Sequence, residues 1–210
     1  MIKVGLSGNN FSGKNTVSKI FKQLSIPVFD ADVVLKFIIN YDIETIKTIK
    51  DRLGESVFIN GQVSKYLIKD RLSMDIILDC ANYKLFRAYQ RFEEKHPTSV
   101  YTIFKSSFLF ESDWYKKLDY NVSVFCPKIN RMERIHELTG KKVSQIAFDL
   151  RSEMDDLDKN RLSNFVIHNY GNKDVLDYVN QVDTIIIDEF LKKERKFTPD
   201  GKGIIISEHY

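Results

Sequence analysis

The stretch that decides the fold is Gly8-Asn9-Asn10-Phe11-Ser12-Gly13-Lys14-Asn15-Thr16. It follows a short β-branched apolar run at residues 2–6, and it precedes residues 17–24, where apolar side chains recur at helical spacing. A second apolar run, Val28-Phe29, follows Pro27 and stops at Asp30. Strand, loop, helix and strand within about thirty residues are typical of a parallel βαβ unit. The sequence therefore predicts an α/β protein with a parallel sheet.

The loop fits the pattern G-x-x-x-x-G-K, which indicates a phosphate site. Its glycines let the backbone curl until successive N–H groups point at phosphate oxygens, and the following helix presents its positive N-terminus. Lys14 would reach the β- and γ-phosphates. The alternative is an ordinary glycine-rich turn, but a loop placed between a strand and a helix favours nucleotide binding. We therefore expect residues 8–16 to bind a nucleotide.

Asn15 departs from this pattern, because Ser or Thr usually stands there and ligates Mg²⁺. An amide oxygen can also ligate a hard cation. Alternatively, Thr16 supplies the nearest hydroxyl, or phosphate and water alone hold the metal. Asn15 and Thr16 are thus the candidate metal ligands.

Two carboxylates, Asp30 and Asp32, follow the second predicted strand. Ligands bind at this edge of an open parallel sheet. On an extended segment, side chains two residues apart point the same way, so we expect one or both to face the loop. A carboxylate there could accept the proton of an attacking hydroxyl or hold Mg²⁺. A helix cap is the alternative role, and we expect Asp30 to cap and Asp32 to take part in chemistry.

The rest of the chain predicts helices at residues 33–97, with a break at Asn60-Gly61, and again at 129–162. Apolar runs at 99–104, 120–125 and 165–167 predict further strands. A helix is expected near 174–182, and residues 184–187 fit either a strand or its continuation. The tail from residue 192 is expected to be peripheral.

Composition restricts the class of protein. The 210 residues are 43% hydrophobic and carry a net charge of only +3, which excludes a disordered chain and gives no reason to expect nucleic acid as a partner. Two cysteines, Cys80 and Cys126, make no disulfide framework. There is no apolar run of about 20 residues for a membrane helix and no leader segment. We expect a cytoplasmic protein without a membrane partner, in an oligomeric state that the sequence does not determine.

Four ordered blocks make residues 2–182 resemble the dephospho-coenzyme A kinase family of P-loop kinases. These blocks are the phosphate loop with its preceding strand, Asp30-Ala31-Asp32, Phe108-Leu109-Phe110-Glu111 and Val166-Ile167-His168-Asn169-Tyr170-Gly171. The resemblance implies transfer of the γ-phosphoryl group of ATP, with Mg²⁺, to the ribose 3′-hydroxyl of dephospho-CoA in coenzyme A biosynthesis. Both substrates are small molecules.

The resemblance also implies roles for residues and regions. Asp32 matches the family's proposed base, Lys14 its loop lysine, Asn169 and Gly171 the segment near the nucleotide base, and Glu111 the acceptor side. The implied fold is one P-loop kinase domain over residues 1–210 with a three-layer core. That core would comprise residues 1–32, 98–127 and 163–190. Residues 33–97 would form a helical acceptor-binding region and 128–162 a helical lid.

The chain departs from the family pattern mainly on the acceptor side. Ser107 stands where a proline is usual, Lys36 where an arginine follows D-A-D, and Leu138 where a second lid arginine is usual. The usual acceptor-side His-Pro pair is missing at residues 80–85. A nucleoside or deoxynucleoside monophosphate kinase and a non-catalytic nucleotide-binding protein therefore stay as alternatives.

Two arginines and a tryptophan are further candidates for the site. Phosphoryl transfer needs cations on the equatorial oxygens, for which Arg134 and Arg151 are candidates, with a solvated helical face as the alternative. Arg134 is our choice for the catalytic site. Trp114 lines either the acceptor site or the core. Together with Asp30, Lys36 and Glu111, Trp114 makes up the expected acceptor-binding set.

Overall fold

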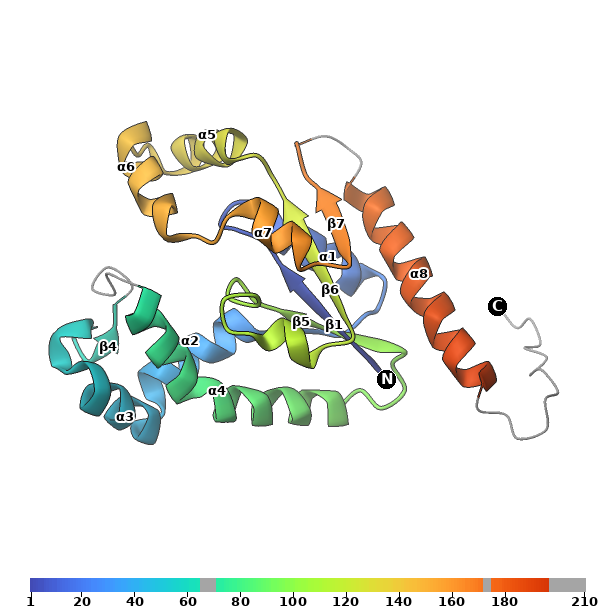
Figure 1. The fold of residues 1–210 in the computed structure, drawn as a ribbon, viewed down its shortest axis with the longest axis horizontal. Helices are drawn as coiled ribbons and strands as arrows, with labels where there is room; N and C mark the ends of the chain where they lie inside the picture. Colours follow the sequence, from blue (N-terminus) through green and yellow to red (C-terminus); the bar gives the residue numbers. More distant parts are fainter. Residues whose placement is uncertain (65–70, 172–174, 197–210) are drawn as a thin grey trace.

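A computed structural model describes residues 1–64, 71–171 and 175–196 of the chain (Figure 1). Its centre is a sheet of five parallel strands in the order β2-β5-β1-β6-β7. The strands are β1 (Ile2–Ser7), β2 (Val28–Asp30), β5 (Tyr101–Lys105), β6 (Tyr120–Phe125) and β7 (Phe165–His168). The expected α/β fold with a parallel sheet is confirmed, and the expected strands lie within two residues of the observed ones.

One face of the sheet is covered by α1 (Lys14–Gln23) and α8 (Val175–Lys196). Val17 and Phe21 of α1 pack with Val179 and Ile186 of α8 against apolar side chains of the sheet, and all four are fully buried. Parallel strands need helical crossovers, so both faces of the sheet are expected to be apolar and covered. The first core lies between the sheet and these two helices.

The other face is covered by α2 (Ala31–Tyr41), α4 (Arg71–Glu94) and the segment after β5, which contains the 3₁₀ turn Trp114–Lys117. Phe29, Phe104 and Tyr89 form an aromatic cluster there, with ring centroids 5.0–5.6 Å apart. Aromatic side chains bury large areas, so few are needed to form a core. The second core therefore joins β2 and β5 to residues 33–97, which we call the helical region.

The helical region also contains α3 (Ile43–Leu53), a 3₁₀ turn at Glu55–Val57 and a small hairpin of β3 (Phe58–Ile59) and β4 (Gln62–Val63). The hairpin turns at Asn60 and Gly61, whose φ values are 50° and 77°. The break expected at Asn60-Gly61 is thus a hairpin turn, for which Asn-Gly is the favoured pair. Of this region, residues 65–70 lie outside the described part of the chain.

After β6 the chain forms α5 (Lys128–Thr139), α6 (Val143–Asp149), a 3₁₀ turn at Leu150–Ser152 and α7 (Asp156–Arg161). In Figure 1 this segment lies at the upper left and the helical region at the lower left, both at the same side of the sheet. The chain then enters β7 and α8. Residues 184–187 continue α8 rather than form a strand. The expectation of a peripheral tail falls mostly on residues 197–210, outside the described part.

In the described parts of the chain, no helix is both long and apolar enough to cross a membrane.

Candidate active site

The phosphate loop lies between the end of β1 and the start of α1, with Gly13 as the N-cap of α1. Gly13 has φ 98°, and a Cβ there would lie 1.9 Å from the Asn169 side-chain nitrogen. That nitrogen donates to the Ser12 carbonyl at 2.7 Å. Only glycine fits a left-handed conformation with so close a neighbour. The structure thus brings together two segments that the sequence assigned to the nucleotide, the loop and the end of β7.

Lys14 and Asp32 form the centre of the site. The Lys14 ammonium lies 3.1 Å from Asp32 Oδ2, and only 8% of Lys14 is exposed. Ser107 holds the same carboxylate twice, because its N–H donates to Oδ1 at 2.8 Å and its hydroxyl donates to Oδ2 at 2.9 Å. The Lys14 ammonium also donates to the Ser107 hydroxyl oxygen. Asp32 is therefore fixed beside the lysine of the phosphate loop.

Burial and neighbouring charges act on both groups. Burial alone would raise the pKa of Asp32, but Lys14 and the hydrogen bonds from Ser107 outweigh it and hold that pKa below its ordinary value. Burial lowers the pKa of Lys14 more than Asp32 raises it, and the ammoniums of Lys105 and Lys159 act in the same direction as burial. The carboxylate of Asp32 is therefore ionised at neutral pH.

Asp30 is placed differently from what its spacing predicted. It ends β2, and its carboxylate caps α2 by accepting from the Val33 N–H at 3.3 Å. Its other oxygen accepts from the Lys105 ammonium at 2.5 Å. Because the helix already starts at Ala31, the segment is not extended, and the two aspartates bind different lysines. The premise of an extended segment is therefore wrong and the cap by Asp30 is confirmed, while both carboxylates bind ammoniums that lie at the phosphate loop.

Two further lysines are buried beside Lys14. Lys105 is 7% exposed, and its ammonium also donates to Asn15 Oδ1 at 3.0 Å. Lys159, from α7, is 2% exposed and lies 2.8 Å from Glu111 Oε1. The Lys159 ammonium also donates to the Ser107 carbonyl at 3.3 Å. Three lysines thus converge at the carboxyl ends of the strands, and each pairs with one carboxylate.

The segment 128–161 contacts the phosphate loop through buried polar groups. Arg131, 2% exposed, donates to the Asn10 carbonyl at 3.1 Å and pairs with Glu153 at 2.6 Å and Asp156 at 3.1 Å. Glu153 accepts from the Asn10 N–H at 3.0 Å. The Asn9 amide nitrogen donates to Asp156 at 2.8 Å. Burial raises the pKa of Asp156, although Arg131 and Asn9 act against it. One guanidinium thus joins the loop to two acids.

The two arginines considered for the transferred phosphoryl group occupy different places. Arg134 donates to the carbonyls of Phe11 at 3.0 Å and Asn169 at 3.1 Å, so it spans the loop and the end of β7. Gly171, with φ 95°, lies next to it, and a Cβ there would be 3.6 Å from Arg134 Nη2. The Arg151 guanidinium lies 3.5 Å from the Phe148 ring centroid. Arg134 is therefore at the loop, and Arg151 contacts a neighbouring side chain of its own segment.

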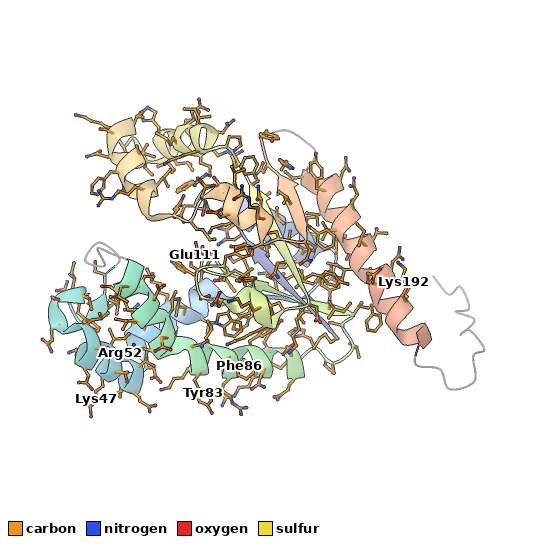
Figure 2. All side chains as sticks on the ribbon, in the orientation of Figure 1. Lys47, Arg52, Tyr83, Phe86, Glu111 and Lys192 are labelled. Atoms are coloured by element: carbon orange, nitrogen blue, oxygen red, sulfur yellow. The ribbon has the colours of Figure 1, made fainter. Side chains whose placement is uncertain are left out.

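A cavity of about 290 Å³ adjoins the site. Glu111 lines it, and in Figure 2 Glu111 lies between the helical region and segment 128–161. Trp114 also lines it, although it is 3% exposed and stacks on Phe104 with centroids 4.4 Å apart. Trp114 is therefore a core residue that also lines this cavity, and its role at an acceptor site stays a prediction. Lys36 is exposed, and its ammonium has no hydrogen bond or ion pair within the described residues.

Asn15, one of the two candidate metal ligands, does not fit a divalent ion as its side chain is arranged. Mg²⁺ takes oxygen ligands at about 2.0–2.1 Å in an octahedron. The Asn15 oxygen instead accepts from the Lys105 ammonium, and Asp30 at the end of β2 binds the same ammonium. No cluster of three or more His, Cys, Asp or Glu side chains suited to a metal occurs among the described residues.

Sequence reasoning missed three buried cations: Lys105, Lys159 and, as a structural residue, Arg131. A signal existed for Lys105, because a lysine directly follows an apolar run of a predicted strand. Lys159 and Arg131 lie in a segment rich in charges, where the pattern does not separate a buried cation from a solvated one. Ser107 was identified only as a departure from a family pattern.

Comparison with known proteins shows what the chain is similar to. A family model described as dephospho-CoA kinase matches residues 2–174. The dephospho-CoA kinase of Bacteroides fragilis is 26% identical over 183 residues, covering 85% of this chain and 89% of that relative. The dephospho-CoA kinase of Clostridium perfringens is 25% identical over 201 residues, covering 89% and 96%. The matches therefore extend over most of the chain.

Solved structures agree on the fold. TT1252 from Thermus thermophilus has a TM-score of 0.71 at 20% identity, covering 90% of this chain and 97% of that one. A dephospho-CoA kinase from Campylobacter jejuni has a TM-score of 0.59 at 16% identity, covering 89% and 98%. At these sequence identities, the structural similarity shows a shared fold and nothing more specific.

Proposed function

The chain belongs to the dephospho-CoA kinase family, and we propose that its site transfers the γ-phosphoryl group of ATP to the ribose 3′-hydroxyl of dephospho-CoA, with Asp32 as general base. The enzyme is a kinase and uses ATP. Its product is CoA, so it acts in coenzyme A biosynthesis. The observation that carries the role of Asp32 is its position beside Lys14 at 3.1 Å, with two hydrogen bonds from Ser107.

The proposed reaction uses groups that are already in place. The loop N–H groups and Lys14 bind the β- and γ-phosphates. Asp32 accepts the proton of the 3′-hydroxyl as its oxygen attacks the γ-phosphorus. The new O–P bond forms while the bond to the β,γ-bridging oxygen breaks, and ADP leaves with that electron pair. A carboxylate that stays ionised at neutral pH suits this role, and the lowered pKa of Asp32 supports it.

The remaining assignments belong to the same proposal. Asn169 and Gly171 lie near the nucleobase of ATP. Arg134, which contacts both the loop and Asn169, binds the transferred phosphoryl group in the closed state. The helical region 33–97 binds the acceptor, and 128–162 acts as the lid. The cavity lined by Glu111 and Trp114 supports this division.

On the acceptor side, Glu111 and Lys36 each have a polar group that is available to bind a substrate. Glu111 Oε2 is buried without a hydrogen-bond partner among the described residues, so it can accept from a substrate. The exposed Lys36 ammonium suits the pyrophosphate of dephospho-CoA, and Asp30 acts only through Lys105 and the cap of α2. Mg²⁺ enters the proposal as an ion carried on the phosphates of ATP. A cytoplasmic location stays part of the proposal as well.

The test is an assay of ADP release with ATP and Mg²⁺ against dephospho-CoA and a panel of (deoxy)nucleoside monophosphates. We expect turnover with dephospho-CoA. Asp32→Asn keeps the size of the side chain but removes its charge, so turnover should fall by about 10²–10⁴-fold. Asp30→Asn is the matched control, because it alters the other carboxylate of the same segment, and its loss should be smaller.

Each outcome bears on a different part of the proposal. Turnover of a monophosphate with none of dephospho-CoA would overturn the acceptor. Near-normal turnover by a folded Asp32→Asn variant, or a larger loss in Asp30→Asn, would overturn the assignment of the base. A chain that binds ATP but turns over no acceptor would be a non-catalytic relative.

A further inference from the structure

Asn15 occupies the position at which the phosphate-loop motif places the side chain that ligates Mg²⁺. Its Oδ1 atom is the only side-chain oxygen it offers, and that atom accepts from the Lys105 ammonium at 3.0 Å. The oxygen that Asn15 could offer to Mg²⁺ is therefore already bound to a cation, and this cation is an ammonium of the chain itself.

Strand register puts Lys105 at this point. Lys105 is the last residue of β5, and it pairs in register with Leu6 of β1 on one side and with Asp30 of β2 on the other. Leu6 lies two residues before the loop, and Asp30 ends its own strand. A lysine here has its side chain at the carboxyl edge of the sheet, directly beside the site where phosphate is expected.

The ion pair of Lys105 with Asp30 is largely buried. The side chain of Lys105 is 9% exposed, and it lies 2.5 Å from Asp30 Oδ2. A charge so far removed from water needs fixed partners. Its two partners are Asp30 and Asn15, one at the end of β2 and one at the start of α1. The ammonium is thus held between the two groups that would otherwise be free to bind a metal ion.

We propose that the Lys105 ammonium replaces a protein-ligated divalent cation at this site, so that the chain binds nucleotide phosphates without ligating Mg²⁺ through its own side chains. The inference rests on the proposed nucleotide site. An ammonium has three N–H donors, and Asn15 and Asp30 take two. The third has no acceptor among the described residues, so a phosphate oxygen can accept from it.

The ammonium and a directly ligated Mg²⁺ exclude each other. A Mg²⁺ bonded to Asn15 Oδ1 at about 2.0–2.1 Å would lie close to the buried like charge of Lys105, whose ammonium is 3.0 Å from the same oxygen. Lys105 would have to leave both Asn15 and Asp30 before the ion could enter. The Lys14 ammonium would also repel the ion, because it lies close enough to Lys105 for the charge of Lys105 to lower the pKa of Lys14.

Thermodynamic linkage turns this exclusion into a measurement. If the chain supplies a ligand to Mg²⁺, the ion must tighten ADP binding by the same factor by which the chain tightens Mg²⁺ binding to ADP. We propose isothermal titration of the full chain with ADP, once in EDTA and once in excess Mg²⁺. For the native chain we expect the two dissociation constants to agree within about threefold, well below the 5–150-fold range typical of coupled sites.

The variant Lys105→Met keeps the length of the side chain and frees Asn15 and Asp30. We expect ADP to bind at least about tenfold more tightly with Mg²⁺ than in EDTA in this variant, and Lys105→Met/Asn15→Ser should show the same dependence. Lys84→Met is the matched control, because Lys84 also pairs with two acids, Asp42 and Glu44, but lies in the helical region. It should keep the metal-independent binding of the native chain.

The result for the native chain can overturn the inference by itself, so the test does not depend on the variants folding. ADP binding at least tenfold tighter with Mg²⁺ in the native chain would overturn it, as would a folded Lys105→Met variant that stays metal-independent. A chain that does not bind ADP under either condition would instead overturn the proposed nucleotide site. Failure of this inference and failure of the proposed function are thus distinguishable.

Discussion

Individual charged residues at the carboxyl edge of the sheet are arranged as buried pairs. Each lysine is less than a tenth exposed, and each is matched by one carboxylate, which limits the cost of removing the charges from water. A phosphate that enters the loop would compete with these carboxylates for the same ammoniums. The pairs are Lys14 with Asp32, Lys105 with Asp30, and Lys159 with Glu111.

The lowered pKa of Asp32 makes a prediction about stability and pH. A carboxyl group whose pKa is lower in the folded chain than its ordinary value of 3.8 stabilises the fold in full above that value. The contribution is lost as the pH falls through the lower, folded-state pKa. Asp32→Asn should therefore reduce the free energy of unfolding by about 1–3 kcal/mol at pH 7, and the difference should persist at pH 5 and shrink towards pH 3.

Urea unfolding of both chains at these pH values measures the difference. Asp158→Asn is the control, since Asp158 pairs with Arg161 at the surface and should change the free energy of unfolding by less than about 1 kcal/mol throughout. A difference for Asp32→Asn that disappears already at pH 5 would mean that the pKa of Asp32 is not lowered in the fold.

At the residue scale the sequence predicted those groups whose role follows from local spacing. Lys14 follows from the loop motif, and Asp32 from a carboxylate at the end of a strand. Lys105 could not be assigned a partner, because its pairing with Asp30 depends on the order of β2 and β5 in the sheet. The burial of Lys159 likewise depends on α7 packing beside Ser107, 52 residues away. Such contacts are tertiary and leave no periodic signal.

Among the elements, α5 is joined to the phosphate loop by one side chain. Arg131 projects from α5 and binds the Cys126 carbonyl at 3.2 Å, the Asn10 carbonyl, and the acids Glu153 and Asp156. Its planar fork of donors suits several acceptors at fixed directions, which the point charge of lysine does not. Arg131 therefore anchors the first half of α5 beside the phosphate loop.

Arg131→Ala should reduce the free energy of unfolding by about 3–5 kcal/mol, because it leaves two partly buried carboxylates without their partner. Arg161→Ala offers a matched control: Arg161 pairs with Asp158 at the surface, and its removal should cost less than about 1 kcal/mol. Arg131→Lys should fall between the two. Urea unfolding measures all three, and equal losses for Arg131→Ala and Arg161→Ala would contradict the structural role of Arg131.

Element types were predictable where one periodicity extends over a long segment or where a strand is rich in β-branched and aromatic residues. β6 was predicted to the residue, because its β-branched and aromatic residues stop at Cys126-Pro127. Residues 184–187 were ambiguous, since Thr184 and three isoleucines favour a strand locally, whereas the packing of α8 on the sheet continues the helix. The hairpin at residues 58–63 has strands of only two residues, too short for alternation to be visible.

At the scale of the whole molecule, the sheet packs in two cores, one on each of its faces. The core formed by α1 and α8 contains Val175, Val179, Val182 and Ile186, spaced three or four residues apart along α8. This spacing gives the helix one buried stripe. The family model ends at residue 174, so α8 lies outside the matched stretch, yet it covers the face of the sheet opposite to the helical region. Its contribution to stability should therefore be large.

Two adjacent isoleucines test this. Ile186 is fully buried in the core, whereas Ile185 is 45% exposed on the same turn of α8. Ile186→Ala should reduce the free energy of unfolding by about 2–5 kcal/mol, because it removes buried methyl groups and leaves a cavity. Ile185→Ala carries the same change in helix propensity and should cost less than about 1 kcal/mol. Urea unfolding compares the two variants directly. If both lose the same free energy, α8 is not packed on the sheet through the face described, because only a buried stripe separates neighbours that are chemically identical.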